Sequence, residues 1–101
     1  MLSFYVYILK CSDGSYYVGH TEDLDNRMNQ YYKVGTCSGY VATRLPVELV
    51  WSEAMETRYD ALVAERQIKK WSRKKKEALI VGGWEALQGF SRKNRKAHNE
   101  K

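Results

Sequence analysis

The sequence contains few of the residues that rigidify or cross-link a chain: one proline and two cysteines among 101 residues. It also lacks a long hydrophobic run, because no window approaches the roughly 20 apolar residues of a membrane span and the N-terminus has no signal-peptide run. Cys11 and Cys37 show neither metal-binding nor redox spacing. We therefore expect two buried or idle thiols, a cytoplasmic location and no membrane partner.

Internal repeats and long linkers are absent as well. A chain of this length suits one domain, and 44% hydrophobic residues are enough for a modest core. From residue 91 onward the sequence is polar and basic and has no apolar period. We expect one domain at residues 1–90 and a basic, flexible tail at 91–101.

The net charge of +5 is divided unevenly along the chain. Residues 1–65 carry five Lys and Arg against nine Asp and Glu, whereas residues 66–101 carry twelve against three. This division favours a polyanionic partner, and the alternative is a solvated basic tail that only aids solubility. Positions 66–76 contain seven basic residues, a density that suits sequence-independent contact with phosphates. The predicted nucleic-acid-binding residues are Arg44, Lys69, Lys70, Arg73, Lys74, Lys75 and Lys76.

Two runs of aromatic and β-branched residues flank an Asp-Gly pair, a pattern that predicts a β-hairpin. We expect a three-residue loop at positions 12–14, with Gly14 in the left-handed conformation. This loop pairs Leu9 with Tyr17, so that Tyr7 and Tyr17 project from one face. A two-residue loop would place the two phenols on opposite faces. The longer loop is preferred because two phenols on one face can form a site.

The rest of the chain alternates between helix and strand signals. Apolar spacing predicts a helix over residues 23–34, and a third strand is expected at residues 48–54. Thr57 and Ser72 can cap two further helices, the second of which stops at Gly82 and Gly83. The order β-β-α-β-α-α predicts an α+β domain with a small three-stranded antiparallel sheet flanked by helices.

Two triplets and two charged residues carry a family resemblance. The triplets YVY at residues 5–7 and YVG at residues 17–19 are followed by Arg27 and Glu65 on the expected helices. In order and spacing they resemble the signature of the GIY-YIG nucleases, with Tyr in place of the first glycine and Val in place of both isoleucines. The resemblance covers roughly residues 4–80. It is strongest to the small stand-alone bacterial members, and the excision-repair incision nuclease is a more distant relative.

The resemblance implies a metal-dependent endonuclease that cleaves phosphodiesters, of DNA rather than RNA, to a 3′-hydroxyl and a 5′-phosphate. Tyr7 and Tyr17 would position and deprotonate the attacking water. Arg27 would stabilise charge on the scissile phosphate, and Glu65 would hold one Mg²⁺ or Mn²⁺.

Two further positions belong to the expected site. His20, three residues after Tyr17, is a second candidate base; the excision-repair nuclease has Lys there. Tyr31, one helical turn after Arg27, stands where restriction-type relatives and most stand-alone members have His, whereas the excision-repair nuclease has Tyr; this departure affects the expected proton-transfer route rather than the site. The expected catalytic residues are Tyr7, Tyr17, His20, Arg27 and Tyr31, with Glu65 as the metal ligand.

Several of these residues also have a purely structural explanation. Arg27 leans toward the apolar side of its helix and can form an internal ion pair. Glu65 can pair with Lys69 one turn away, and His20 can be a partly exposed strand-end residue. Without catalysis, the same fold is a nucleic-acid-binding accessory module. A protein-interaction domain with a basic tail explains the charge but not the Tyr, Arg and Glu set, whose convergence on one concave surface would favour the enzyme.

Overall fold

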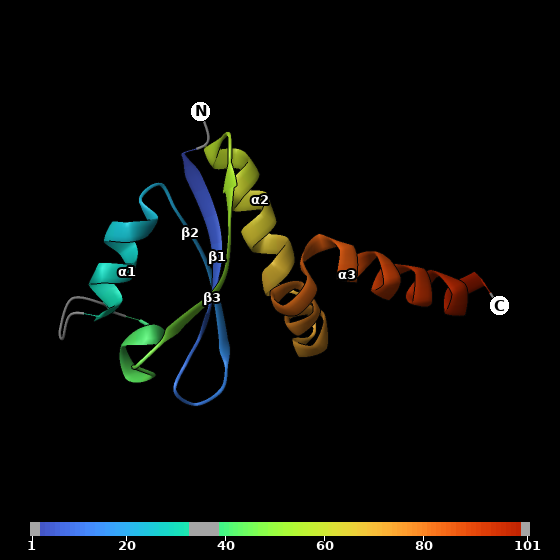
Figure 1. Cartoon of the computed structure of the whole chain (residues 1–101), viewed down its shortest axis with the longest axis horizontal. Coiled ribbons are helices and arrows are strands. Elements are labelled where there is room, and N and C mark those ends of the chain that lie inside the picture. The colour runs from blue at the N-terminus through green and yellow to red at the C-terminus, as the bar shows by residue number, and fades with distance from the viewer. Residues whose placement is uncertain (1–2, 33–38, 100–101) are drawn as a thin grey trace. The chain divides into compact units, whose positions relative to one another are not determined.

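The computed structural model describes residues 3–32 and 39–99, with side chains described as far as residue 88. The chain forms two compact units, residues 1–70 and residues 71–101. Its elements follow the predicted order β-β-α-β-α-α, with one short 3-10 helix, η1 (Val41–Thr43), before the third strand (Figure 1). The predicted α+β fold is confirmed.

The first unit is built on a three-stranded antiparallel sheet in the order β2-β1-β3. The strands are β1 (Phe4–Lys10), β2 (Tyr16–Thr21) and β3 (Glu48–Met55). Residues 6–9 of the central strand are fully buried, as expected for a strand covered on both faces. Strand β2 lies at an edge of this sheet, and the candidate site is arranged along it.

The β1–β2 hairpin has the predicted register. Gly14 has a φ of 86°, in the region that favours glycine, and the loop closes through a hydrogen bond of 2.8 Å from the Cys11 N–H to the Ser15 carbonyl. Leu9 pairs with Tyr17. The three-residue loop is therefore confirmed, and alternation along the strands places Tyr7 and Tyr17 on the same face.

Helices α1 (Leu24–Tyr32) and α2 (Arg58–Lys69) cover opposite faces of the sheet (Figure 1). Helix α1 begins after Asp23, whose carboxylate accepts a 3.0 Å hydrogen bond from the Asn26 N–H. At the start of α2 the predicted cap is present, because the Thr57 hydroxyl accepts a 3.0 Å hydrogen bond from the Asp60 N–H.

A hydrophobic core fills the space between the sheet and α1. Its buried members come from β1, α1 and the segment around η1. They are Tyr7, Leu9, Cys11, Met28, Tyr31, Val41 and Val47. Apolar residues whose spacing predicted these elements are thus among those that pack in the core. On α2 the residues Ala61, Glu65 and Ile68 are buried, and Glu65 is the only charged residue of that helix among them.

The second unit is dominated by helix α3 (Arg73–Asn99). The Ser72 hydroxyl accepts a 3.2 Å hydrogen bond from the Lys75 N–H, which confirms the predicted cap. At Gly83 the backbone has φ 68° and ψ −162°, so the helix breaks at the predicted glycine pair. The backbone then returns to helix as far as Asn99, further than predicted, because a glycine kink interrupts a helix without preventing helix formers beyond it. The flexible tail at 91–101 stays a prediction.

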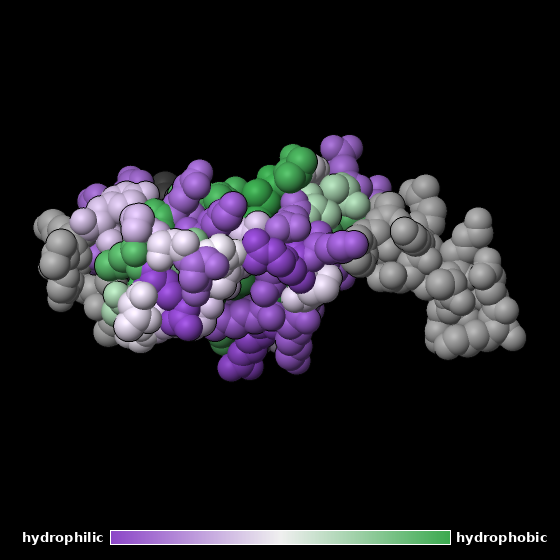
Figure 2. Space-filling view, turned by 90° about the horizontal axis from the view of Figure 1, so that it is seen from below, coloured by the Kyte–Doolittle hydropathy of each residue, from purple (hydrophilic) through white to green (hydrophobic). Residues whose placement is uncertain are grey.

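Hydrophilic side chains cover much of the face in Figure 2, and apolar side chains gather in smaller areas between them. No helix within the described residues is long and apolar enough to cross a membrane. Cys11 is buried and free, as expected, whereas Cys37 and the predicted end of the first helix lie outside the described residues.

Candidate active site

The predicted site residues gather around the edge strand β2. Tyr7 and Tyr17 project from the face that α1 covers, whereas His20 pairs with Val6 and therefore projects from the face that α2 covers. Side chains from both faces can meet beyond the open edge of a sheet. The predicted residues therefore do not lie on one face: they form two clusters of polar side chains, one on each side of the β2 edge.

The first is the phenol cluster, formed by Tyr7, Tyr31 and Arg27. The Tyr7 hydroxyl lies 2.8 Å from the Tyr31 hydroxyl and accepts a 3.4 Å hydrogen bond from Arg27 Nη1. Tyr7 is fully buried and Arg27 is partly buried. Within the described part of the chain Arg27 forms no ion pair, so the internal pair considered from the sequence is not found there.

Burial sets the protonation of the phenols. Desolvation, followed by the hydrogen bond shared with Tyr31, raises the pKa of Tyr7 far above its ordinary value, and the opposing charge of Arg27 does not offset this. Burial also raises the pKa of Tyr17. Both phenols are therefore protonated at neutral pH, and a protonated phenol can donate one hydrogen bond. For Arg27, burial lowers the pKa but the two neighbouring phenols raise it by more, so the guanidinium remains charged.

The glycine of the second triplet provides the space that this arrangement requires. A Cβ atom at Gly19 would lie 2.6 Å from the Tyr7 hydroxyl oxygen and 3.0 Å from Cε2 of Tyr17. Such separations are shorter than van der Waals contact. Glycine at this position lets the two tyrosines approach the strand and each other.

The second is the Glu65 cluster, formed by Glu65, Lys69 and His20. Lys69 Nζ lies 2.8 Å from Glu65 Oε2, and His20 Nδ1 forms a short hydrogen bond to Glu65 Oε1. Burial raises the pKa of Glu65, but the bonds from Lys69 and His20 lower it by more, so the carboxylate is ionised at neutral pH. An ionised carboxylate only accepts hydrogen bonds, so Nδ1 is the donor and Nε2 of a neutral imidazole can accept a proton.

The Glu65 cluster can be tested for its fit to a metal ion. Among the described residues, no three His, Cys, Asp or Glu gather to hold a metal by themselves. A carboxylate has about four lone-pair positions, and Lys69 and His20 occupy two of those on Glu65. Mg²⁺ commonly uses one or two carboxylates and completes its shell with water and substrate phosphate. The ionised Glu65 keeps about two lone-pair positions beside those bonded to Lys69 and His20, so it can supply one carboxylate to such a cation.

Tyr17 lies between the two clusters. Lys69 Nζ lies 5.8 Å from the centre of its ring. Burial is the main reason that the pKa of Tyr17 is raised; Tyr31 and Glu65 also raise it, and Lys69 lowers it. On another side its ring stacks on Tyr40, with centroids 6.0 Å apart and planes 24° from parallel. This ring therefore connects the two halves of the site to the η1 segment.

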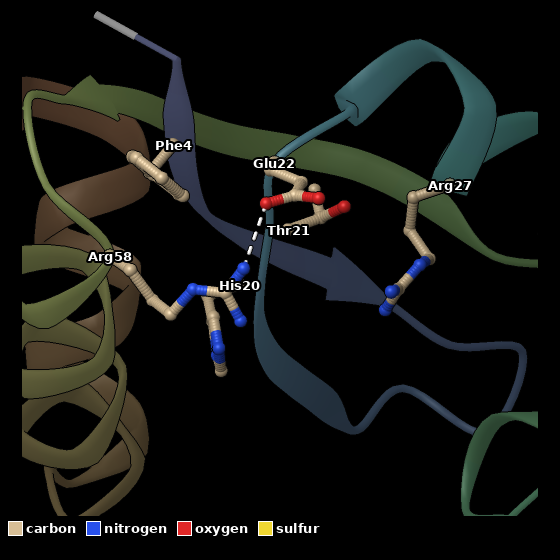
Figure 3. Close-up of a pocket in the computed structure, with 6 residues that line it drawn as sticks. All are labelled: Phe4, His20, Thr21, Glu22, Arg27 and Arg58. Atoms are coloured by element: carbon tan, nitrogen blue, oxygen red, sulfur yellow. Dashed lines mark hydrogen bonds and ion pairs between the residues drawn. The ribbon is translucent and has the colours of Figure 1, made fainter.

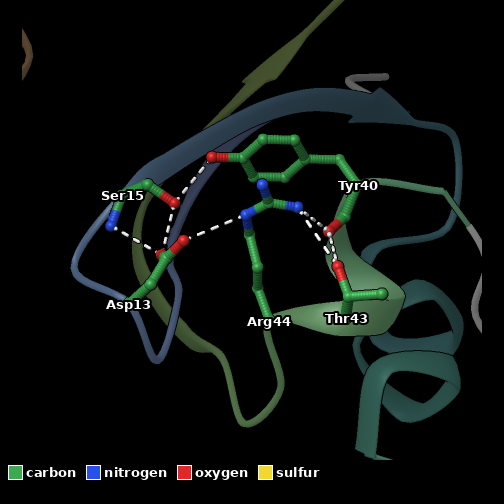
Figure 4. Close-up of polar contacts among 5 residues, drawn as sticks. All are labelled: Asp13, Ser15, Tyr40, Thr43 and Arg44. Carbon is green, nitrogen blue, oxygen red and sulfur yellow. Dashed lines mark hydrogen bonds and ion pairs between the residues drawn. The ribbon is translucent and has the colours of Figure 1, made fainter.

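Four residues that we call the loop clasp fasten the hairpin loop to η1: Asp13, Ser15, Tyr40 and Arg44 (Figure 4). Arg44 Nε donates to Asp13 at 3.0 Å, its Nη1 donates to the Tyr40 carbonyl at 2.9 Å, and its guanidinium lies 3.7 Å from the Tyr40 ring centre. The Tyr40 hydroxyl donates to Ser15 at 2.7 Å. The hydrogen bonds from Ser15, and more weakly Arg44, lower the pKa of Asp13. Arg44 thus has a structural role, and its contact with nucleic acid stays a prediction.

The other predicted nucleic-acid-binding residues fall in two elements. Lys69 ends α2 and Lys70 follows it, while the four others begin α3 in the second unit. Some are already engaged: Arg73 pairs with Glu77 at 3.2 Å, and Lys75 Nζ lies 4.4 Å from the Trp71 ring centre. Burial lowers the pKa of Lys76. Phosphate contact by this run stays a prediction.

A pocket at the C-terminal end of β2 contains residues that the sequence did not single out (Figure 3). It is lined by Phe4, His20, Thr21, Glu22, Arg27 and Arg58. Arg58 gave no signal in the sequence because it resembles an ordinary solvated charge at a helix start. Nothing local in the sequence indicated that the Tyr40 ring would stack on Tyr17.

Comparisons with known proteins identify the family of this chain. Residues 3–78 match the GIY-YIG catalytic domain. A UPF0213 protein of Staphylococcus aureus is 44% identical over 80 residues, which cover 79% of this chain and 96% of that protein. The solution structure of the UPF0213 protein BH0048 from Bacillus halodurans is similar, with a TM-score of 0.51 and 38% identity over 83% of this chain and 92% of that one. The solution structure of the protein EF2693 from E. faecalis is also similar. Its TM-score is 0.55, and it is 36% identical over 90% of this chain and 88% of that one. The chain therefore belongs to the GIY-YIG nuclease family.

Proposed function

We propose that this protein is a metal-dependent endonuclease that hydrolyses phosphodiester bonds, with DNA as its substrate. Family membership supports nuclease chemistry. The observation that carries the proposal is the partly buried Arg27 guanidinium, which is hydrogen-bonded to a phenol and forms no ion pair among the described residues. A guanidinium in such surroundings is stabilised by an anion, and its planar fork of donors suits phosphate oxygens.

Arg27 binds the scissile phosphate in this proposal and stabilises the charge that develops there. Tyr7, held by Tyr31 at 2.8 Å, fixes the position of the guanidinium. The raised pKa values of Tyr7 and Tyr17 support protonated phenols. Tyr7 is fully buried and acts through Arg27, whereas Tyr17 donates to the phosphate or the attacking water in this proposal. This differs from the expectation that a tyrosine deprotonates the water.

His20 is the proton acceptor that the geometry supports best. Its Nδ1 is held by the carboxylate of Glu65, which leaves Nε2 to take a proton from water.

Glu65 would hold the Mg²⁺ or Mn²⁺ ion together with water and phosphate oxygens. When bound, such a cation offsets charge on the phosphate and on the leaving oxygen. The lowered pKa of Glu65 supports this assignment, because the carboxylate is ionised at the pH at which a cation would bind.

The test is the variant Glu65→Gln, which keeps the size of the side chain and removes its charge. We expect nicking with Mg²⁺ or Mn²⁺ to fall by about 10³-fold, because a metal ion contributes several kcal/mol to such a transition state. Affinity for the same DNA without metal should not fall, since a negative charge near the phosphate is lost. Glu48→Gln, the same change at an exposed residue of β3, is the matched control.

The substrates should include flaps, junctions, nicked duplexes and single strands of DNA, with RNA counterparts. Undiminished nicking by Glu65→Gln would remove Glu65 from the site and leave the ion pair with Lys69 as its function. If the wild-type protein binds these molecules and nicks none of them, the chain is a nucleic-acid-binding accessory module.

A further inference from the structure

The pocket at the end of β2 holds a second arginine beside the proposed scissile-phosphate site. Arg27 enters it from α1 and Arg58 enters it from α2, on the other side of the β2 ribbon (Figure 3). The Arg58 guanidinium lies 5.7 Å from the centre of the Phe4 ring, which also lines the pocket. Two guanidinium groups and the imidazole of His20 therefore share one opening.

In this structure Arg58 is held by a carboxylate. Its Nη2 donates to Glu22 Oε2 at 2.9 Å, and the two side chains are 68% and 63% exposed. Exposed ion pairs contribute little to stability, so another anion can replace Glu22 with a small change in free energy. The phosphates of a nucleic-acid strand offer such anions in series, close to one another.

We propose that Arg58 binds a second phosphate of the nucleic acid, next to the phosphate bound by Arg27, and that Glu22 holds Arg58 until the nucleic acid arrives. The inference rests on the proposed function, because it takes Arg27 as the residue at the scissile phosphate. Arg58 is a binding residue in this scheme and touches no reacting atom. Glu22 is its competitor, so the two partners of one ion pair have opposite effects on binding.

The experiment measures affinity for a short DNA duplex without metal, by fluorescence anisotropy over a series of salt concentrations. Arg58→Gln should lower the affinity by about tenfold and reduce the slope of log affinity against log salt by about 0.9, the value for one lost phosphate contact. Glu22→Gln should raise the affinity about two- to fivefold, because Arg58 is released. An ion pair that only supports the fold would give effects of the same sign in both variants.

Two controls remove the general effect of charge. Lys10 on β1 and Glu48 on β3 are exposed and are paired in register. Lys10 is six residues along β1 from Phe4, which places the pair about 20 Å from that edge of the pocket. Lys10→Gln and Glu48→Gln make the same charge changes there and should shift affinity less than the pocket variants. In the double variant Glu22→Gln/Arg58→Gln, the gain from Glu22→Gln should disappear, because its only route is through Arg58.

Duplexes that end in a 5′-hydroxyl and in a 5′-phosphate identify the source of the phosphate. An equal loss with Arg58→Gln on both assigns a backbone phosphate, and a loss confined to the phosphorylated duplex assigns a terminal one. The proposal is overturned if Arg58→Gln binds like Lys10→Gln, if Glu22→Gln keeps its gain without Arg58, or if the wild-type protein does not bind DNA. If nicking depends on Glu65 but Arg58→Gln leaves the affinity unchanged, the proposed nuclease stands and the second phosphate site does not. If Arg58→Gln lowers the affinity but nicking does not depend on Glu65, the phosphate site stands and the proposed role of Glu65 does not.

Discussion

The phenol cluster and the Glu65 cluster lie on either side of the same edge strand and differ in whether their charged group has a partner of opposite charge. Glu65 is a carboxylate with two nitrogen partners, Lys69 and His20. Arg27 is a cation that donates a hydrogen bond to the neutral phenol of Tyr7, and it has no carboxylate partner among the described residues. One side is balanced and the other has an excess of positive charge, so the site is complementary to an anion on the α1 side.

The strongest way to break this comparison is to remove the unbalanced cation. Arg27→Gln should lower the nicking rate by about 10³-fold, and Arg27→Lys should fall between it and wild type, since an ammonium cannot reproduce the guanidinium fork. Metal-free affinity for DNA should fall as well, unlike the result expected for Glu65→Gln. Nicking and binding assays on one substrate check both effects. Retained affinity in Arg27→Gln would show that the phosphate does not bind on this side.

A smaller effect is expected when the phenol loses only its hydroxyl. Tyr7→Phe leaves the Tyr31 hydroxyl without its buried partner, so the free energy of unfolding should fall by about 1–2 kcal/mol. The nicking rate should fall about 10- to 100-fold, because Arg27 loses the group that orients it. Urea unfolding and nicking assays measure the two effects. Tyr59→Phe, at a side chain that is 72% exposed, is the control and should change neither.

The two clusters should lose their contributions to the free energy of unfolding at opposite ends of the pH scale. The pKa of Tyr7 is raised in the folded state, so its contribution is complete below its ordinary value of 10.0 and is lost as the pH rises above it. The pKa of Glu65 is lowered, so its contribution is present above its ordinary value of 4.5 and is lost as the pH falls below it. Unfolding free energies should therefore fall less in alkali for Tyr7→Phe and less in acid for Glu65→Gln than for wild type. Parallel curves for all three proteins would contradict this assignment.

The smallest effect is expected at the loop clasp. Arg44→Gln and Asp13→Asn each break the same solvent-screened pair and should lower the free energy of unfolding only slightly. If Arg44 acts only as a clasp, both variants loosen Tyr40 under Tyr17 and reduce nicking by a few-fold in the same direction. If Arg44 also binds phosphate, metal-free affinity falls for Arg44→Gln alone. Binding and thermal unfolding of the two variants separate these cases.

Local sequence signals predicted most of the fold. The hairpin register follows from an Asp-Gly turn and a side-chain period of two, both of which act within a few residues. The caps at Thr57 and Ser72 are equally local. The signature residues Tyr7, Tyr17, Arg27 and Glu65 lie on the predicted strands and helices, while their roles stay predictions.

Other features depend on contacts between distant parts of the chain. The bond from His20 to Glu65 joins residues 45 positions apart, and it forms because α2 covers the face from which His20 projects. Arg58 reaches the pocket through the same packing. The raised pKa of Tyr7 could not be predicted either, since it reflects the depth of burial rather than the type of neighbour.

The approach of Tyr7 to Gly19 affects the sheet as much as the chemistry. Glycine weakens a strand because it has no side chain to shield the backbone, and an aromatic ring laid across the neighbouring strand can provide that shield. The Tyr7 ring occupies this position, since a Cβ at Gly19 would lie 2.7 Å from its Cζ atom. A substitution that removes the ring would therefore expose the backbone of β2 to water and loosen the hairpin. The Tyr7 ring covers the backbone of β2, and its hydroxyl bonds to Tyr31 and Arg27. Only a substitution that keeps the ring, such as Tyr7→Phe, can separate these two contributions.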